Sequence, residues 1–278
     1  MKKITFALVL LLVSGMALAQ GKEKVKGSKI VVIEQKQVDT FDGLEVRDNL
    51  EVSLIKGDKA GVELEADDNL QSALGISMNG SMIILSMAKD ITGEKKFSVR
   101  VTYTDSFKTI ITRNDAKANA LEEVKLDDIA FQCFDNSKLY LNLGCKSFSI
   151  TADDKSKVEL NAKAESGNLV LSKNAEIKAL ISATALKCDL YQKASAKIEG
   201  DVIDMILRMD NNAAYTGKSM TVKNMSLTTE GYVNCSVNAE TSLILEASGS
   251  SEVTIYGEPK IDLKKFADNA KLMKKALK

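Results

Sequence analysis

The stretch DNSKLYLN, from Asp135 to Asn142, returns nineteen residues later as DKSKVELN, from Asp154 to Asn161. The same pattern recurs, more weakly, through the second half of the chain. Seven small residues align the repeats at a mean spacing of 19 residues: Ser137, Ser156, Ala175, Ala196, Ala214, Gly231 and Ser251. A period near twenty is typical of solenoids, in which stacked units share one core.

Each repeat contains two runs in which apolar and polar residues alternate. The first run of one repeat holds Leu139, Leu141 and Leu143, and the second holds Phe148 and Ile150. Alternation with period two predicts half-buried strands, whereas a helix needs period 3.6 over ten or more residues. Turns rich in Asp, Asn, Lys, Ser and Gly separate the runs. Each unit is therefore predicted to be strand, polar turn, strand, polar turn.

A nineteen-residue unit of two short strands cannot bury its apolar face alone, but a stack of such units can. The predicted fold is all-β: a single-stranded, right-handed parallel β-helix with coils of about 19 residues, because parallel crossovers are almost always right-handed. In this fold Leu139 and Val158 lie in one core column, while Lys138 and Lys157 point outward.

The start of the chain has the three parts of a signal peptide. Lys2 and Lys3 precede an apolar run over 4–13, and Ala17-Leu18-Ala19 forms a cleavage site. An uncleaved anchor is the alternative, although the run is short for a membrane span. Export is therefore predicted, to the periplasm, the outer-membrane surface or the extracellular space.

Four regions are predicted in all: a signal peptide over 1–19, a lead-in over 20–39, a β-helix over 40–257 and a helix over 258–278. Before Ala116 the strands persist but their spacing is irregular. Residues 40–105 are read as early coils with irregular turns, and a separate small sandwich is the alternative.

The last segment has a different pattern. Apolar residues fall on one helical face at Leu263, Phe266, Ala270, Met273 and Leu277. A helix that caps the open last coil is predicted, because an uncapped coil exposes sheet edges. The seven Lys and two Asp of residues 260–278 leave an alternative, which is contact with an anionic membrane surface.

Composition excludes several functions. The chain has 38 basic and 38 acidic residues, and loss of Lys2 and Lys3 leaves a net charge of −2. Nothing in this balance suggests nucleic acid, which needs a basic face. It has no His, which excludes Ser-His-Asp and Cys-His catalysis. No cofactor, metal or catalytic residue is predicted, and no later stretch resembles a transmembrane span.

The cysteines and acidic doublets receive structural interpretations. An even count of four suggests disulfides in an exported protein, but no two of Cys133, Cys145, Cys188 and Cys235 share a repeat column. Buried free thiols are therefore favoured, and no disulfide is predicted. The doublets Asp67-Asp68, Asp127-Asp128 and Asp153-Asp154 could serve calcium or carbohydrate chemistry, but turns attract Asp in any case.

The tyrosines are the candidate ligand-binding residues. Tyr215 and Tyr232 each follow an alignment residue by one, so they are predicted to stack outward on adjacent coils. Tyr140 and Tyr256 are predicted to point outward as well. Exposed aromatic rings bind sugars or proteins, and the alternative is cross-strand packing that shields the sheet.

The sequence also resembles a known family. Residues Phe41–Leu70, FDGLEVRDNLEVSLIKGDKAGVELEADDNL, followed by GSMIILSM and FSVRVTYTDSFKTIITRNDAKANA, are similar to the auto-transporter adhesin family with a head GIN domain. The similarity covers roughly residues 40–262. It implies a secreted or envelope-associated parallel β-helix with no established catalytic residues. The family's Gly-Ser-Gly turns are replaced at Asn114-Asp115-Ala116 and Asn136-Ser137-Lys138.

These observations predict a secreted, non-enzymatic, adhesin-like β-helix protein of the cell envelope that binds a surface partner or polysaccharide. The alternatives are a carbohydrate-active enzyme on the same fold and an envelope scaffold that assembles end to end. The oligomeric state stays open.

Overall fold

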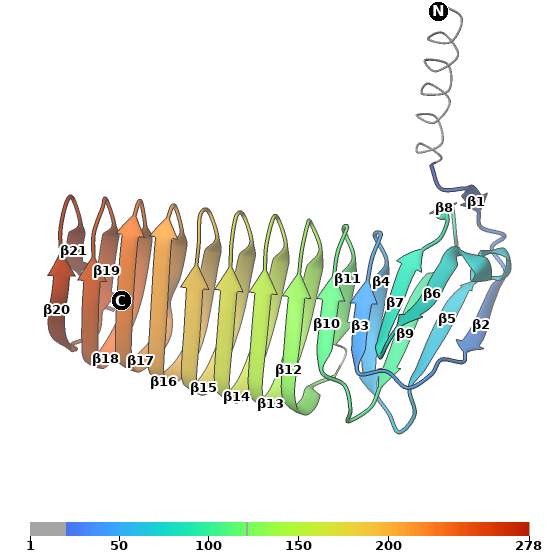
Figure 1. Cartoon of the computed structure of the whole chain (residues 1–278), viewed down its shortest axis with the longest axis horizontal. Helices are drawn as coiled ribbons and strands as arrows, with labels where there is room; N and C mark the ends of the chain where they lie inside the picture. The colour runs from blue at the N-terminus through green and yellow to red at the C-terminus, as the bar shows by residue number, and fades with distance from the viewer. Residues whose placement is uncertain (1–20, 121, 278) are drawn as a thin grey trace, which may run out of the picture.

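The computed structural model describes residues 21–120 and 122–277. Within these residues the chain is a flattened β-solenoid with one short 3-10 helix, η2 (Asp68–Ala73). Figure 1 shows the chain rising along the near face, turning over at the upper edge and descending along the far face as it advances toward the C-terminus, which is a right-handed path. The predicted signal peptide lies outside the described residues.

The central coils are built from seven long strands, and from β13 onward each strand bends halfway and contributes to both faces. They are β12 (Val124–Cys133), β13 (Lys138–Ala152), β14 (Lys157–Leu171), β15 (Glu176–Leu190), β16 (Ser195–Asn211), β17 (Ala214–Gly231) and β18 (Asn234–Ala247). We call the near face of Figure 1 sheet A and the far face sheet B. Sheet A holds the second half of each long strand, and sheet B the first half of each from β13 onward.

The register of these strands explains the repeat. Lys138 pairs with Lys157, Leu139 with Val158 and Asn142 with Asn161, each nineteen residues apart. Inward residues consequently form unbroken columns between the two sheets. One such column in sheet A consists of Phe131, Ile150, Leu169, Cys188, Leu207, Leu227 and Leu245. All of these residues are buried, which confirms the predicted solenoid.

A second column lies at the upper turns, where a residue with positive φ recurs in each coil. Its members are Asp135, Asp154, Lys173, Gln192, Asn211, Gly231, Gly249 and Asp268, with φ from 55° to 81°. Asp, Asn and Gly tolerate this left-handed backbone best, and a buried residue three positions after the start of the turn closes it. In the turn from Asp153, the Ser156 N–H donates to the Asp153 carbonyl at 3.2 Å.

The N-terminal end combines coils with an antiparallel cap. Two early coils are parallel to the rest: β3 (Gly43–Val46) with β4 (Glu51–Lys56), and β10 (Thr109–Thr112) with β11 (Lys117–Ala120). In sheet B, β9 (Phe97–Tyr103), β5 (Gly61–Asp67) and β2 (Val31–Lys36) follow β4, and β5 is antiparallel to both neighbours. In sheet A, β7 (Met82–Met87) and β6 (Leu74–Asn79) follow β3 as an antiparallel pair. These strands continue the solenoid's own sheets and share its single core.

The remaining pair lies beside the cap. Strands β1 (Lys24–Lys26) and β8 (Asp90–Thr92) form a small parallel sheet of their own. Asp67, completely buried, ties this region to the cap by accepting hydrogen bonds from the backbone N–H groups of Lys29, Lys95 and Lys96 at 2.8 to 3.2 Å. Burial alone would raise the Asp67 pKa, but these hydrogen bonds outweigh it and the pKa is lowered.

The predicted C-terminal capping helix is wrong. After β19 (Glu252–Tyr256), the chain forms β20 (Lys260–Phe266) and β21 (Lys271–Lys274), which add one more coil to β18 and β19. The exposed edges of β18 and β19 offer backbone partners to any segment that reaches them, and the alternation of Ile261 and Leu263 also suits a strand. Pairing at the sheet edge therefore overrides the helical spacing of the apolar residues.

Candidate functional site

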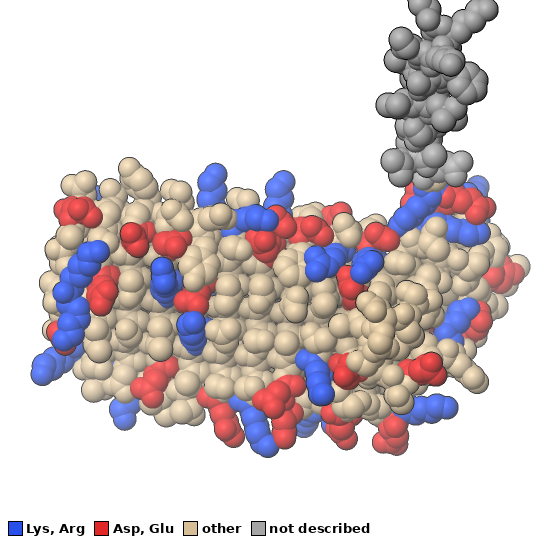
Figure 2. All heavy atoms as spheres, in the orientation of Figure 1, with Lys and Arg blue, Asp and Glu red and all other residues tan. Residues whose placement is uncertain are grey.

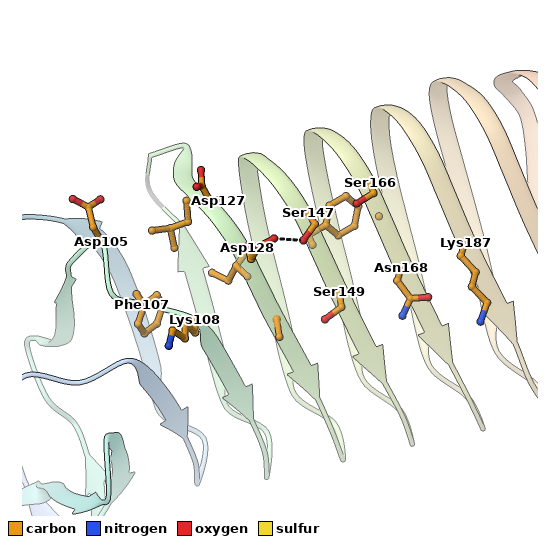
Figure 3. A pocket seen from close by; sticks show the side chains of 15 residues that line it. Asp105, Phe107, Lys108, Asp127, Asp128, Ser147, Ser149, Ser166, Asn168 and Lys187 are labelled. Carbon is orange, nitrogen blue, oxygen red and sulfur yellow. Dashed lines mark hydrogen bonds between the residues drawn. The ribbon is translucent and has the colours of Figure 1, made fainter.

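The candidate site is a shallow groove on sheet A, where the early coils meet the regular ones (Figure 3). We call it the front groove. Its volume is about 760 Å³. It is lined by Asp105, Phe107, Lys108, Leu126, Asp127, Asp128, Ile129, Ala130, Ser147, Phe148, Ser149, Ser166, Gly167, Asn168 and Lys187.

Two parts of the chain give the groove its shape. The segment 104–108, between β9 and β10, forms one wall, and it is anchored by Phe107, which is buried and stacks on Tyr103 with ring centroids 5.1 Å apart. The outward residues of three consecutive coils form the opposite side. Figure 3 shows Ser149, Asn168 and Lys187 in line along that side, since the register pairs each with the next. A ligand lying across the coils therefore meets one polar side chain per coil.

The carboxylates of the groove already have partners on the protein. Asp127 lies 2.8 Å from the Lys146 ammonium and Asp105 lies 2.5 Å from that of Lys56. Asp128 accepts a hydrogen bond from the Ser147 hydroxyl. The hydrogen bond to Asp127 raises the pKa of Lys146, so this lysine stays charged. The groove thus presents charged and hydroxyl groups in fixed positions.

A second hollow of about 720 Å³ continues the front groove around the lower bend, sharing Asp105, Leu126 and Asp127 with it. Its lining adds the lysines Lys56, Lys125, Lys146 and Lys163 and the thiol of Cys145. Partial burial, and secondarily the charge of Asp128, raise the pKa of Cys145 to about 11. This thiol is therefore a poor nucleophile at neutral pH.

The opposite face carries a rear groove of about 620 Å³. Tyr140 lies in it, beside Asn142, Asn161, Lys178 and the exposed Leu180. Tyr140 is 36% exposed, so its predicted outward direction is confirmed. Its neighbour in register on the next coil is Glu159.

The predicted outward stack of Tyr215 and Tyr232 is wrong. Tyr232 is 72% exposed, but Tyr215 is 1% exposed and pairs in register with Ala196 and Cys235 in an inward column. Burial raises the Tyr215 pKa, and among the described residues its hydroxyl donates to the Met205 sulfur alone, at 3.8 Å. Tyr215 therefore belongs to the core.

The error arises from one residue of register. The buried turn residue of this coil is Ala213, three positions after Asp210, and not its neighbour Ala214. A shift of one residue exchanges the inward and outward sides of a strand. Tyr256 is half-buried beside Asn238, so the four predicted tyrosines lie in different places and form no common site.

The remaining candidates are structural. The four cysteines are free thiols, and all but Cys145 are buried. Asp67 of the first acidic doublet is buried and hydrogen-bonded, which differs from the predicted solvated turn. In the described part of the chain no three His, Cys, Asp or Glu side chains gather in a way that could hold a metal ion. Over 21–120 and 122–277 there is also no helix with the length and apolarity to cross a membrane.

Sequence reasoning missed the front groove. The Asp127-Asp128 doublet was its one visible signal, but the wall at 104–108 depends on where the antiparallel cap meets the coils. The position of that junction cannot be read from the repeat period of the sequence.

The structure is a β-solenoid with a polar groove across its coils. The chain belongs to the family described as "putative auto-transporter adhesin, head GIN domain", whose model matches residues 40–181 and 161–259. No curated protein matches the chain.

Three solved structures have the same fold. A "putative adhesin" from Parabacteroides distasonis aligns with a TM-score of 0.66 at 16% identity, over 90% of this chain and 100% of that one. A "putative lipid binding protein" from the same species aligns at 0.58 and 14%, over 91% and 97%. A "putative adhesin" from Parabacteroides merdae aligns at 0.56 and 14%, over 92% and 98%. At these identities the likeness shows the fold alone.

Proposed function

We propose that this chain is an exported, non-enzymatic, adhesin-like module that binds a cell-surface or envelope polysaccharide in the front groove. The observation that carries the proposal is the line of Ser149, Asn168 and Lys187 across three coils. Hydroxyl, amide and ammonium groups at a constant spacing suit a polymer whose polar groups also repeat. Family membership supports an adhesive role, and the predicted signal peptide supports export.

A carbohydrate-active enzyme is the second candidate, because Asp105, Asp127 and Asp128 gather in this groove together with lysines. Glycoside hydrolysis commonly needs a pair of carboxyl groups, one of which acts as an acid. An acid of that kind is usually kept protonated by an apolar pocket, whereas these three carboxylates are exposed and bonded to Lys56, Lys146 or Ser147. The arrangement therefore suits binding better than catalysis.

The test is a binding screen of residues 20–278 against glycan arrays and envelope polysaccharides. One variant changes Asn168 and Lys187 to Ala in the front groove. The matched control changes the same residue types, Asn161 and Lys178, to Ala in the rear groove. All four side chains face outward, but the Lys187 ammonium also lies 3.0 Å from the carboxylate of the buried Asp189. Circular dichroism therefore has to show that each variant is folded, and Asn168→Ala alone is measured beside the double variant because it leaves this ion pair in place.

We expect binding that falls at least tenfold in the Asn168→Ala, Lys187→Ala variant and is unchanged in the control. Loss only in the control would place the ligand in the rear groove beside Tyr140. No binding to any glycan would contradict the proposal, and release of new reducing ends or unsaturated products from a bound polysaccharide would favour the enzyme.

A further inference from the structure

The last coil of the solenoid has no cover. Strands β20 and β21 extend the two sheets, and nothing in the described residues packs on their outer side. The inward residues Ile261, Leu263 and Phe266 pair with the buried Leu243, Leu245 and Ala247, so they close the core from one sheet. They are nevertheless 42% to 48% exposed, and Leu272 on the facing strand is 36% exposed. The end of the molecule is therefore an open cross-section of its core.

Lysines gather beside this apolar end, at the C-terminal end of the face that Figure 2 shows. Residues 258–277 hold six lysines against Glu258, Asp262 and Asp268. Lys264, Lys271 and Lys274 pair with acidic groups at 2.6 to 2.8 Å. Lys260, Lys265 and Lys275 have no ion pair within the described residues. This end therefore carries positive charge that the described part of the protein does not neutralise.

The strand edges at this end are shaped against pairing with another strand. An extra residue at Lys264 shifts the register of β20 between Leu263 and Lys265, and a bulge of this kind interrupts a ladder. Lys274 pairs with the buried Ile255 and so points inward on a strand of four residues. Short edges, bulges and inward charges are the devices by which proteins prevent edge-to-edge addition.

We propose that the C-terminal coil, residues 258–277, docks on an anionic phospholipid surface. A bilayer interface accommodates exposed apolar side chains and attracts lysines at the same time, and it requires no strand ladder. A second copy fits less well, since two C-terminal ends repel each other. The N-terminal edge also carries inward charges, because Glu34 and Lys36 pair with the buried Leu64 and Val62. Docking at this end leaves the front groove, farther along the molecule, free.

The test measures binding of residues 20–278, which contain every described strand, to vesicles by co-sedimentation. The segment 1–19 is omitted because its apolar run would bind bilayers by itself. The vesicles contain phosphatidylglycerol and phosphatidylcholine in equal parts, or phosphatidylcholine alone. The test variant changes Lys260, Lys265 and Lys275 to Glu. The matched control changes three exposed lysines of the central coils, Lys155, Lys193 and Lys223, to Glu.

We expect binding to the anionic vesicles only. It should fall at least about 100-fold in the test variant, because each lysine near such a surface contributes roughly a factor of five and each Glu adds repulsion. The control, which has the same net charge, should lose far less. A second variant, Met273→Ser with Leu277→Ser, removes apolar groups that lie outside the core and should weaken binding while circular dichroism stays unchanged.

Equal losses in test and control variants would overturn the proposal, since they would show attraction by total charge. Absence of binding to anionic vesicles would overturn it too. A concentration-dependent dimer that the Lys-to-Glu variant alters, without vesicle binding, would instead make this end an interface between copies. Glycan binding by the front groove is measured separately, so either proposal can fail alone.

Discussion

At the scale of single residues, the direction of each side chain decides its role. Tyr215 and Tyr232 each follow a small residue by one in the sequence, yet Tyr215 lies in the core and Tyr232 in solvent, because Tyr215 pairs in register with Cys235. The core accepts the Tyr215 ring because Gly217 leaves room beside it: a Cβ on Gly217 would lie 2.3 Å from the ring's Cε1. Tyr215 and Gly217 therefore depend on each other for packing.

Gly217→Ala should lower the free energy of unfolding by about 1–3 kcal/mol, because it overpacks the core against Tyr215. In a Tyr215→Leu background, which lacks the Cε1 atom, the same change should cost at least about 1 kcal/mol less. Denaturant unfolding of the four proteins of this cycle measures the difference. Additive effects would show that the two residues do not share this space.

Cys145, the one cysteine that is not buried, should still react slowly for a partly exposed thiol. With a pKa of about 11, its thiolate fraction at pH 8 is small, and alkylation by iodoacetamide should be about 100-fold slower than for a free cysteine. The rate should rise about tenfold per pH unit up to pH 10. Asp128→Asn removes a negative charge that disfavours the thiolate, so it should speed alkylation. Mass spectrometry of the Cys145 peptide reads the rate, and a plateau below pH 9 would contradict the prediction.

At the scale of elements, the upper turns set the period of the coils. Each needs a residue with positive φ, and the column uses Asp, Asn or Gly at most positions but Lys173 and Gln192 at two. A residue with a long side chain pays a steric cost there that glycine avoids. The turn that contains Gln192 is closed by the Ala194 N–H, which donates to the Tyr191 carbonyl at 3.1 Å.

Gln192→Gly should raise the free energy of unfolding by about 0.5–1 kcal/mol, because relief of the left-handed backbone exceeds the added freedom of the unfolded chain. Lys193→Gly, one residue later and without a positive φ, should lower it by up to about 1 kcal/mol. Thermal unfolding of both variants measures the two shifts. Shifts of the same sign at both sites would contradict the role of the turn column.

The sequence predicted the central coils well and the ends poorly, for a physical reason. From β13 to β16 every coil has the same neighbours on both sides, so equivalent positions carry equivalent residues and the period is visible. At the N-terminal end, β5 pairs antiparallel with β2 and β9, a contact that leaves no period. In β17 an insertion around Lys218 shifts the register against both neighbours, so the spacing of equivalent residues departs from nineteen there.

The candidate site was also predictable only where the coils are regular. The outward column of Ser149, Asn168 and Lys187 is regular and could be read from the repeat, but the wall at 104–108 comes from the irregular end. The prediction of a C-terminal helix was wrong because it rested on the residue spacing within that segment alone. The free edges of β18 and β19 determined the structure of the segment instead.

At the scale of the whole molecule, the chain is a one-dimensional stack in which each coil contacts only its neighbours. Stability in such a stack is close to a sum of coil and interface contributions, so a coil can be removed if the register is kept. Ala179 pairs with Ile198 across one coil boundary, nineteen residues apart. Deletion of Ala179–Lys197 therefore joins Lys178 to Ile198 with inward and outward sides preserved.

The most direct test of this stacking compares that deletion with an eighteen-residue deletion, Ala179–Ala196, by denaturant unfolding and circular dichroism. The nineteen-residue deletion should fold to a shorter solenoid with one cooperative transition. The eighteen-residue deletion leaves Lys197 in the middle of a strand, where it must bulge out or face the core, and it should be less stable by at least about 2 kcal/mol. Equal stability of the two deletions, or failure of both to fold, would contradict a stack with a nineteen-residue register.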